Sequence, residues 1–337
     1  MIKEKKTAAK TGDTMYQNAE VKTAKAKRLT KEIVKMKLLK IMGELVIIIL
    51  MFGLCFMILQ PLFNKISVSF MSEMDLYDST IVTVPKHFTL DNYRMAIKAM
   101  DYFNSFVNTF VIAVAVSILQ VVSCLLVGYG FARYDFPFKK FWFAMVILMI
   151  VIPQQTYSSA LQLNFRYFDI FGIFTAIFGE PLNLTGSVAP ILLLAGSCTG
   201  LKCGLYIYLF RQYFRNIPKD IEEAAYVDGC GTIRTLFSIM LPDAMPIASS
   251  CFLFSFVWQW TDNYFSTLLL KSSNLLPAQL SAVTARLQSF LDTRPTLSYS
   301  NCISATGTVL LLIPVIIVYL VAQKRFVETL SASAIKM

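Results

Sequence analysis

Long apolar runs alternate with polar segments along the chain after its first 40 residues. A helix needs about 20 apolar residues to cross a bilayer, and six of the runs come close to that length. We therefore predict an all-α membrane protein with six transmembrane helices. They are placed near Leu45–Leu62, Phe106–Tyr129, Phe141–Ser159, Val188–Phe210, Ile247–Leu270 and Ile303–Val321.

The composition points to the same class of protein. Hydrophobic residues make up 56% of the chain and the mean hydropathy is +0.58, which is too apolar for an ordinary soluble domain. The seven cysteines form no C-x-x-C pair and mostly lie in apolar runs, so we expect them to pack as small hydrophobic side chains. With a single histidine, His87, the sequence offers no metal site, and we expect no cofactor.

The polar connection 211–246, between the fourth and fifth apolar runs, is too long and too patterned for a simple link. Pro218 favours the start of a helix, and acidic side chains fill the first turn, near the positive end of the helix dipole. Gly229 can adopt the positive φ that often ends a helix. We predict a helix–turn–helix whose second helix is capped by Thr232 and carries one apolar stripe. The acidic residues are Asp220, Glu222 and Glu223, and the stripe consists of Ile233, Leu236, Phe237, Met240 and Leu241.

This connection resembles the EAA loop of ABC importer permeases. The family pattern is Glu-Ala-Ala, three residues, Gly, nine residues and Ile-x-Leu-Pro, and every fixed position is met here. The resemblance implies a type I importer permease, in which the loop is a cytoplasmic coupling helix that docks into a cleft of a separate ATPase. The residues expected at that contact are Glu223, Ala224, Ala225, Asp228, Gly229, Ile239, Leu241 and Pro242.

Glu223 is the sharpest single candidate in this loop. The equivalent glutamate of the family pairs with an arginine of the ATPase, and the resemblance implies the same role here. The alternative is a solvated acidic residue that only favours a helix N-terminus.

The C-terminal segment Gln323–Glu328 resembles the carbohydrate-uptake branch of this family, the maltose-type second permease. In all, the resemblance covers residues 105–337. It implies that the chain is a permease subunit that moves a carbohydrate, an oligosaccharide, across the cytoplasmic membrane. The implied partners are a second permease subunit, a cytoplasmic ABC ATPase dimer and an extracytoplasmic solute-binding protein.

Lysine and arginine residues set the orientation of a membrane protein. If both termini are cytoplasmic, the cytoplasmic segments hold 22 of these residues and the external segments hold 8. The first 40 residues supply 12 of the 22, so they decide the orientation, and we predict both termini inside. The resulting order is a basic tail (1–40), a first transmembrane helix (41–63), an extracytoplasmic segment (64–104), a permease core (105–325) that includes the loop 211–246, and a cytoplasmic tail (326–337).

The basic tail has two interpretations. With 12 basic and 4 acidic residues, it could be a nucleic-acid-binding arm or a disordered tail that lies against anionic lipid. It lacks interleaved aromatic residues and adjoins the first span directly, which favours lipid. We therefore expect membrane lipid, and no nucleic acid, as its partner.

The most polar patch within an apolar run is Trp258–Tyr264. It resembles the family's Trp-Asn-Asp-Phe segment, with Thr261 in place of the asparagine. A carboxylate inside a span usually faces water or a partner, and aromatic faces beside amides and carboxylates suit sugar recognition. The alternative is an interfacial aromatic belt. The candidates for the substrate pathway are Trp258, Gln259, Trp260, Asp262 and Asn263, with Gln154 and Gln155 beside Pro153, whereas Asn108 and Gln120 are expected to join helices by hydrogen bonds.

Gly196, Gly200 and Gly204 recur at every fourth position of the fourth run, so they share one face of a continuous helix. Small residues at this spacing let membrane helices approach closely. We predict a packing face inside the bundle or against a partner permease. Chance is the alternative, because glycine is common in membrane spans.

The sequence contains no G-x-x-x-x-G-K-[ST] motif to hold nucleotide phosphates and no H-E-x-x-H or G-x-S-x-G motif to support hydrolysis. We therefore expect no enzymatic activity in this chain and place ATP hydrolysis in a partner subunit. One alternative is a secondary transporter or channel subunit that works without an ATPase, which the lack of an internal repeat disfavours. The other, a membrane-embedded enzyme, has no catalytic residues to support it.

Overall fold

The computed structural model describes residues 2–271, 274–291 and 294–335, with side chains for 35–271, 274–291 and 294–323. The chain divides into two compact units, unit 1 (residues 1–64) and unit 2 (residues 65–337). All candidate site residues belong to unit 2.

Unit 1 is formed by the helix α1 (Ile2–Ser69), whose last residues extend into unit 2. Its stretch Lys35–Ser69 is long and apolar enough to cross a membrane, as predicted for the first span. The prediction of a disordered tail before this span is wrong, because the helix already begins at Ile2. Alanine, lysine, glutamate and methionine supply much of that segment, and all four favour helix.

Unit 2 is built from helices, and its described residues contain isolated bridges but no β-strand. Short helices lie between the long ones, and two of the elements are a 3₁₀-helix (η1) and a π-helix (η2). In chain order the elements are α2 (Glu73–Tyr77), α3 (Asp91–Ala99), α4 (Tyr102–Arg133), α5 (Lys139–Val151), η1 (Gln154–Tyr157), α6 (Ser158–Arg166), α7 (Ile173–Phe178), α8 (Ala189–Gly196), α9 (Cys203–Asn216), α10 (Asp220–Val227), α11 (Thr232–Thr235), η2 (Leu236–Met240), α12 (Leu241–Thr261), α13 (Tyr264–Leu270), α14 (Leu276–Leu287) and α15 (Leu297–Ile335).

The described part of the chain holds four helices long and apolar enough to cross a membrane, or five if one bent pair counts as a span. The all-helical membrane class is correct, but the prediction of six continuous spans is wrong in number. The third apolar run is the bent pair, in which α5 and the helical stretch Gln154–Arg166 meet at 99°. Pro153 lies at this bend and disfavours helical backbone at the residue before it, and Ile152 is indeed extended.

The fourth apolar run is divided as well, because residues 197–202 separate α8 from α9. Gly196, Gly200 and Gly204 therefore do not share one helix face, and that part of the prediction is wrong. Gly200 still packs closely, since an added Cβ would lie 3.1 Å from Gln120 Nε2 of α4. Close packing is found at Gly204, where an added Cβ would lie 2.9 Å from the carbonyl oxygen of Val146 in α5.

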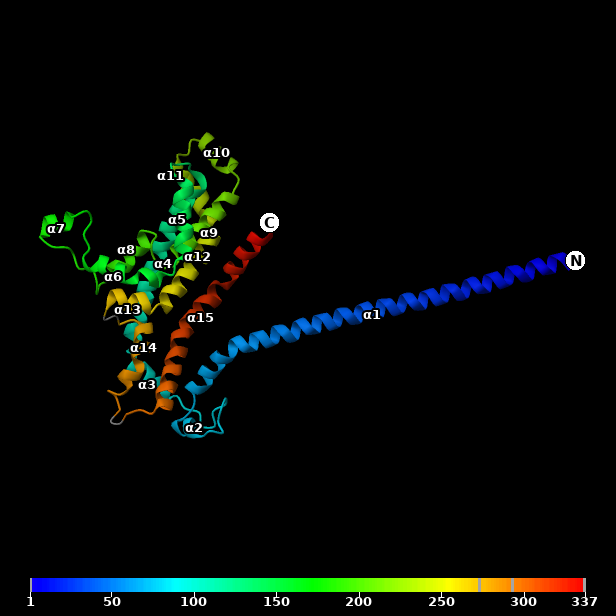
Figure 1. Cartoon of the computed structure of the whole chain (residues 1–337), viewed down its shortest axis with the longest axis horizontal. Helices are drawn as coiled ribbons and strands as arrows, with labels where there is room; N and C mark the ends of the chain where they lie inside the picture. Colours follow the sequence, from blue (N-terminus) through cyan, green and yellow to red (C-terminus); the bar gives the residue numbers. More distant parts are fainter. Residues whose placement is uncertain (1, 272–273, 292–293, 336–337) are drawn as a thin grey trace. The chain divides into compact units, whose positions relative to one another are not determined.

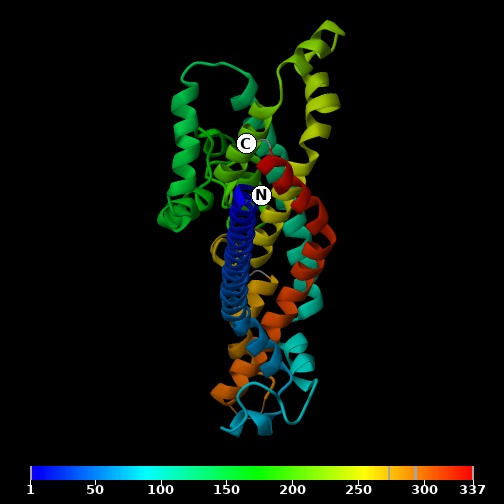
Figure 2. The same cartoon turned by 90° about the vertical axis from the view of Figure 1, so that its right-hand side faces the viewer.

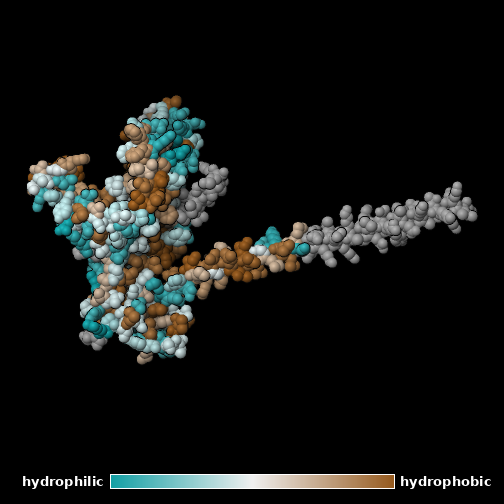
Figure 3. Space-filling model, in the orientation of Figure 1, coloured by the Kyte–Doolittle hydropathy of each residue, from teal (hydrophilic) through white to brown (hydrophobic). Residues whose placement is uncertain are grey.

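Figures 1 and 2 show α10 and α11 at one end of unit 2 and α2, α3 and α14 at the opposite end. The long helix α4 runs between these ends and packs against α9 and α12. Apolar side chains gather over the middle of unit 2, whereas hydrophilic ones surround α10 (Figure 3). This distribution suits an apolar membrane layer between two wet ends.

The interior of unit 2 contains apolar clusters toward each end of α4. Tyr206, Phe210 and Phe214 of α9 fill the cluster near α10. Phe256 and Trp260 of α12 fill the one near α3, and their rings stack with centroids 5.6 Å apart. Large buried aromatic side chains therefore join α4, α9 and α12 into one body.

Helices α4 and α9 approach closely at Gly128. A Cβ at this position would lie 2.5 Å from the Cβ of Phe210 and 3.1 Å from the carbonyl oxygen of Ile207. At Gly130, two residues further along α4, nothing lies within 4 Å of the same position. Gly128 and Ala132 have the small-residue spacing that favours such a contact, a signal that the prediction from the sequence did not use.

We expect Gly128→Ala to destabilise the protein and Gly130→Ala to leave its stability unchanged or higher. Both changes replace a glycine inside a helix, and the higher helix propensity of alanine should stabilise each variant by about 1 kcal/mol. Only the first forces α4 away from α9, and overpacking costs about 1–3 kcal/mol. The thermal unfolding midpoint of the purified protein in detergent measures the difference, and equal midpoints would contradict the close approach.

Candidate functional site

The connection between α9 and α12 is folded as a helix–turn–helix made of α10 and α11. Gly229 follows α10 with φ of +80°, and its N–H donates to the carbonyl of Tyr226 at 3.0 Å. The N–H of Cys230 donates to the carbonyl of Ala225 at 2.9 Å. Together these bonds form the Schellman motif that closes a helix end. A side chain at position 229 would be strained, so the glycine has a structural reason.

The second helix of this loop differs from the prediction in two details. Gly231, not Thr232, is the N-cap residue of α11, and no side chain caps the helix there. The helix then passes through the π-helical turn η2, which rotates the predicted apolar stripe and divides it. Leu236 and Met240 are buried and Leu241 is half-buried, whereas Ile233 and Phe237 are exposed.

Most residues predicted to contact an ATPase lie at the surface of this loop. Large apolar side chains accompany them: Val227 is 88% exposed and Ile233 is 74% exposed. Exposed apolar side chains of this size at a hydrophilic end of a unit mark a contact surface. Among the predicted residues, Glu223, Ala224, Asp228, Gly229 and Pro242 are exposed, Ile239 and Leu241 are half-buried and Ala225 is buried.

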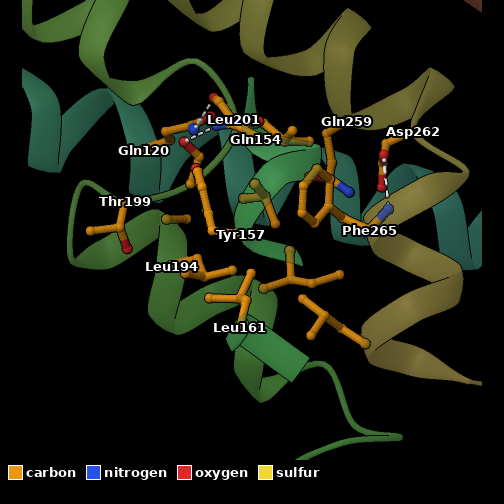
Figure 4. Close-up of a pocket in the computed structure, with 15 residues that line it drawn as sticks. Gln120, Gln154, Tyr157, Leu161, Leu194, Thr199, Leu201, Gln259, Asp262 and Phe265 are labelled. Atoms are coloured by element: carbon orange, nitrogen blue, oxygen red, sulfur yellow. Dashed lines mark hydrogen bonds between the residues drawn. The ribbon is translucent and has the colours of Figure 1, made fainter. Parts of the chain in front are cut away.

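A small cavity lies in unit 2 where helix breaks meet. Its volume is about 30 Å³, room for one or two water molecules. Residues after the bend at Pro153, residues of the segment 197–202 and residues around the α12–α13 junction line it together (Figure 4). The lining residues are Val116, Gln120, Gln154, Tyr157, Leu161, Ile191, Leu194, Ala195, Thr199, Gly200, Leu201, Gln259, Asp262, Phe265 and Leu269.

Glutamine side chains donate hydrogen bonds to backbone carbonyl groups at the α8–α9 break. Gln120 Nε2 donates to the carbonyl of Leu201 at 2.6 Å, and Gln154 Nε2 donates to the carbonyl of Gly200 at 3.2 Å. An unpaired peptide group in apolar surroundings is costly, so these amides stabilise the break. Gln120 also accepts a hydrogen bond from the Ser255 hydroxyl, and thereby joins α4, the break and α12.

Asp262 interacts with the first turn of α13. Its carboxylate accepts hydrogen bonds from the N–H of Phe265 at 3.2 Å, and from the N–H and hydroxyl of Ser266 at 2.8 Å each. Of the described residues that line the cavity, it is the only one with a charged side chain. Its negative charge faces the positive end of the α13 dipole, which explains how a carboxylate is accommodated inside an apolar run.

The two tryptophans of the predicted pathway segment lie outside the cavity. The side chain of Trp260 is buried in the core, where its indole N–H donates to the carbonyl of Leu311 at 3.1 Å. Trp258 is half exposed, and the Lys202 ammonium lies 4.8 Å from the centroid of its ring. This cation–π contact gives a partner to Lys202, a charged residue within the fourth apolar run.

Thus only some of the residues predicted to line the substrate pathway lie around the cavity. Gln154, Gln259 and Asp262 line the cavity, while Trp258, Trp260, Asn263 and Gln155 do not. The prediction missed Tyr157 and Thr199 as lining residues. Gln120 joins helices as expected and lines the cavity as well; a glutamine within an apolar run was the signal for it.

We expect Asp262→Ala to lower the free energy of unfolding by about 0.5–2 kcal/mol, because α13 loses the acceptor for its first N–H groups. Asp262→Asn keeps an oxygen acceptor at the same place and should cost less. Thermal unfolding of both purified variants in detergent measures the difference. Equal stability of the two variants would show that the helix start does not need this acceptor.

Comparison with known proteins gives a family match over most of unit 2. The family described as "Binding-protein-dependent transport system inner membrane component" matches residues 124–331. The arabinooligosaccharides transport system permease protein AraQ of Halalkalibacterium halodurans is 26% identical over 288 residues, 84% of this chain and 93% of AraQ. The maltodextrin transport system permease protein MdxG of Bacillus subtilis is 28% identical over 254 residues, 74% of this chain and 81% of MdxG.

A solved structure shares the fold. It is a crystal structure of a bacterial ABC transporter involved in the import of the acidic polysaccharide alginate. The match has a TM-score of 0.59 and 19% sequence identity, and it covers 85% of this chain and 96% of the other.

Proposed function

Since the chain belongs to the family of binding-protein-dependent transport system inner membrane components, it is a permease subunit of an ABC importer, and we propose that this importer carries a neutral oligosaccharide. The observation that carries the proposal is the EAA spacing on an exposed helix–turn–helix at one wet end of unit 2. The curated relatives named for arabinooligosaccharides and maltodextrin support a carbohydrate cargo. A secondary transporter or channel has no ATPase to dock, so that alternative does not account for this folded loop.

The cavity residues favour a neutral cargo. Carbohydrate hydroxyl groups pair with amide and hydroxyl side chains, and Gln154, Gln259, Tyr157 and Thr199 offer such groups. Asp262 is already engaged with α13, and no basic side chain lines the cavity among the described residues. An acidic sugar would find no cation there.

The loop between α9 and α12 serves, in this proposal, as the coupling helix pair. Glu223, Val227 and Ile233 are exposed, as are several other residues of the EAA motif, so a separate ATPase dimer can bind the surface that they form. ATP binding closes the ATPase dimer and moves α10, hydrolysis reverses the movement, and the helices around the cavity follow. Both termini then lie in the cytoplasm, as the lysine and arginine count predicts.

The remaining partners follow from the same reasoning. The cavity of about 30 Å³ is far too small for a sugar ring, whereas a neighbouring hollow of about 720 Å³ shares Tyr157 and Thr199 with it. In this proposal the cavity opens toward that hollow, and a second permease subunit completes the wall. The end with α2, α3 and α14 lies opposite the coupling helix pair (Figure 1). We place the solute-binding protein at that end.

The central test is uptake by the complete importer, reconstituted in proteoliposomes with its second permease, ATPase and binding protein. We expect ATP-driven uptake of a neutral oligosaccharide, such as an arabino- or malto-oligosaccharide, and none of an acidic one. Glu223→Ala should reduce uptake and ATPase retention strongly, because removing one partner of a buried charge pair costs about 3–5 kcal/mol. Asp220→Ala, another exposed acidic residue of α10, is the matched control. Normal uptake and ATPase retention in Glu223→Ala would contradict this contact.

We expect a cysteine at position 259 to change its accessibility during the transport cycle. In a background with the native cysteines replaced by serine, Gln259→Cys should react with a small polar thiol reagent at different rates in resting and nucleotide-trapped complexes. Gln279→Cys is the matched control, since Gln279 is as buried as Gln259 but does not line the cavity. Equal rates at position 259 in both states would remove the cavity from the pathway.

A further inference from the structure

Two adjacent glutamates of α10 lie in different environments. Glu223 is exposed at the surface of the loop, whereas Glu222 is buried against the last turn of α4. One carboxylate oxygen of Glu222 lies 3.1 Å from Arg133 Nε, and the other accepts a hydrogen bond from the Tyr129 hydroxyl at 2.8 Å. The side chains of Arg133 and Glu222 are only 5% and 9% exposed. Glu222, the neighbour of the motif residue Glu223, thus binds the loop to α4.

Arg133 also holds the backbone that leads into α10. Its Nη2 donates to the carbonyl of Ile217 at 2.9 Å, between the end of α9 and the start of α10. Its Nε has no hydrogen-bond partner among the described residues, so its contact with Glu222 is ionic. The ring of Tyr129 packs edge-on against Phe214 of α9, with centroids 5.2 Å apart. Arg133 and Tyr129, near the end of α4, therefore contact α9, α10 and Ile217 between them.

The charges are not required to fill this space. Two apolar side chains of similar volume commonly stabilise a buried site as well as an ion pair does, because the pair must be stripped of water. An ion pair differs in that its attraction falls off slowly with distance, so it survives small displacements. A loss of one partner leaves a buried charge unpaired, so the two side chains must move together.

The same helix reaches the cavity. Val116 and Gln120 of α4 line it, and Gln120 lies nine residues, about 14 Å along the helix, from Tyr129. A continuous helix passes a displacement of one end to the other. α4 therefore connects α10 directly to the Gln120 amide that holds the α8–α9 break and Ser255.

We propose that Arg133 and Glu222 are positioning residues that pass the displacement of α10 to α4, and thereby open and close the cavity. Glu223 faces the ATPase, and Glu222 faces the permease core. This assignment rests on the proposed function, because α10 is displaced only if an ATPase binds it. Tyr129 orients the Glu222 carboxylate within the same cluster.

The test compares Glu222→Met, Arg133→Met and the double Met variant in the reconstituted importer. We expect each assembled variant to hydrolyse ATP within twofold of the unaltered complex, while uptake falls at least tenfold. The ATP consumed per sugar transported should rise by the same factor. The double variant repacks the site without charge, so it should unfold at the normal temperature and stay uncoupled. A double variant, or any assembled single variant, with the normal ratio of ATP to sugar would overturn the proposal.

A second readout does not depend on the cargo. With the Gln259→Cys reporter, the nucleotide-trapped double Met variant should keep the thiol reactivity of the resting state, whereas the same complex with Arg133 and Glu222 intact should change. If the unaltered complex takes up no oligosaccharide, the proposed cargo is wrong, and the reporter still decides the role of the pair. A normal change of reactivity in the double Met variant would overturn that role.

Discussion

Backbone amide and carbonyl groups inside a membrane need hydrogen-bond partners, and much of unit 2 is arranged around the places where helices cannot provide them. The α8–α9 break exposes the carbonyls of Gly200 and Leu201. Gln154 reaches the first from the bend after α5, and Gln120 reaches the second from α4. The start of α13 exposes N–H groups, and Asp262 accepts from them. Part of the polar wall of the cavity therefore consists of side chains that satisfy these breaks, namely Gln120, Gln154 and Asp262.

The sequence was sufficient for the features that depend on local chemistry. Apolar runs indicated a helical membrane protein, and Pro218, the acidic first turn and Gly229 indicated a helix–turn–helix with its turn at the observed place. It was not sufficient where contacts with residues distant in the sequence determine the local structure. The fourth run is broken because amides on other elements can satisfy residues 197–202, and nothing within the run shows that.

The same limit applies to side-chain direction. Adjacent helix residues point about 100° apart, so Glu222 and Glu223 need not share an environment, and Arg133 in a different helix decides that Glu222 is the one that faces inward. In the same way, Trp260 is a core residue because Leu311 offers it a carbonyl, whereas Trp258 pairs with Lys202. Residue types predicted the polar patch, and tertiary contacts decided which members line the cavity.

The way Asp262 is held has an electrical consequence. Its negative charge is stabilised by the N–H groups and dipole of α13, so no cation from the cargo is needed to hold it in place. A charged cargo crossing a membrane exchanges about 2.3 kcal/mol per charge with each 100 mV of potential. A neutral cargo exchanges none. The membrane potential would then add nothing to the work of import, which the concentration gradient of the cargo alone would set.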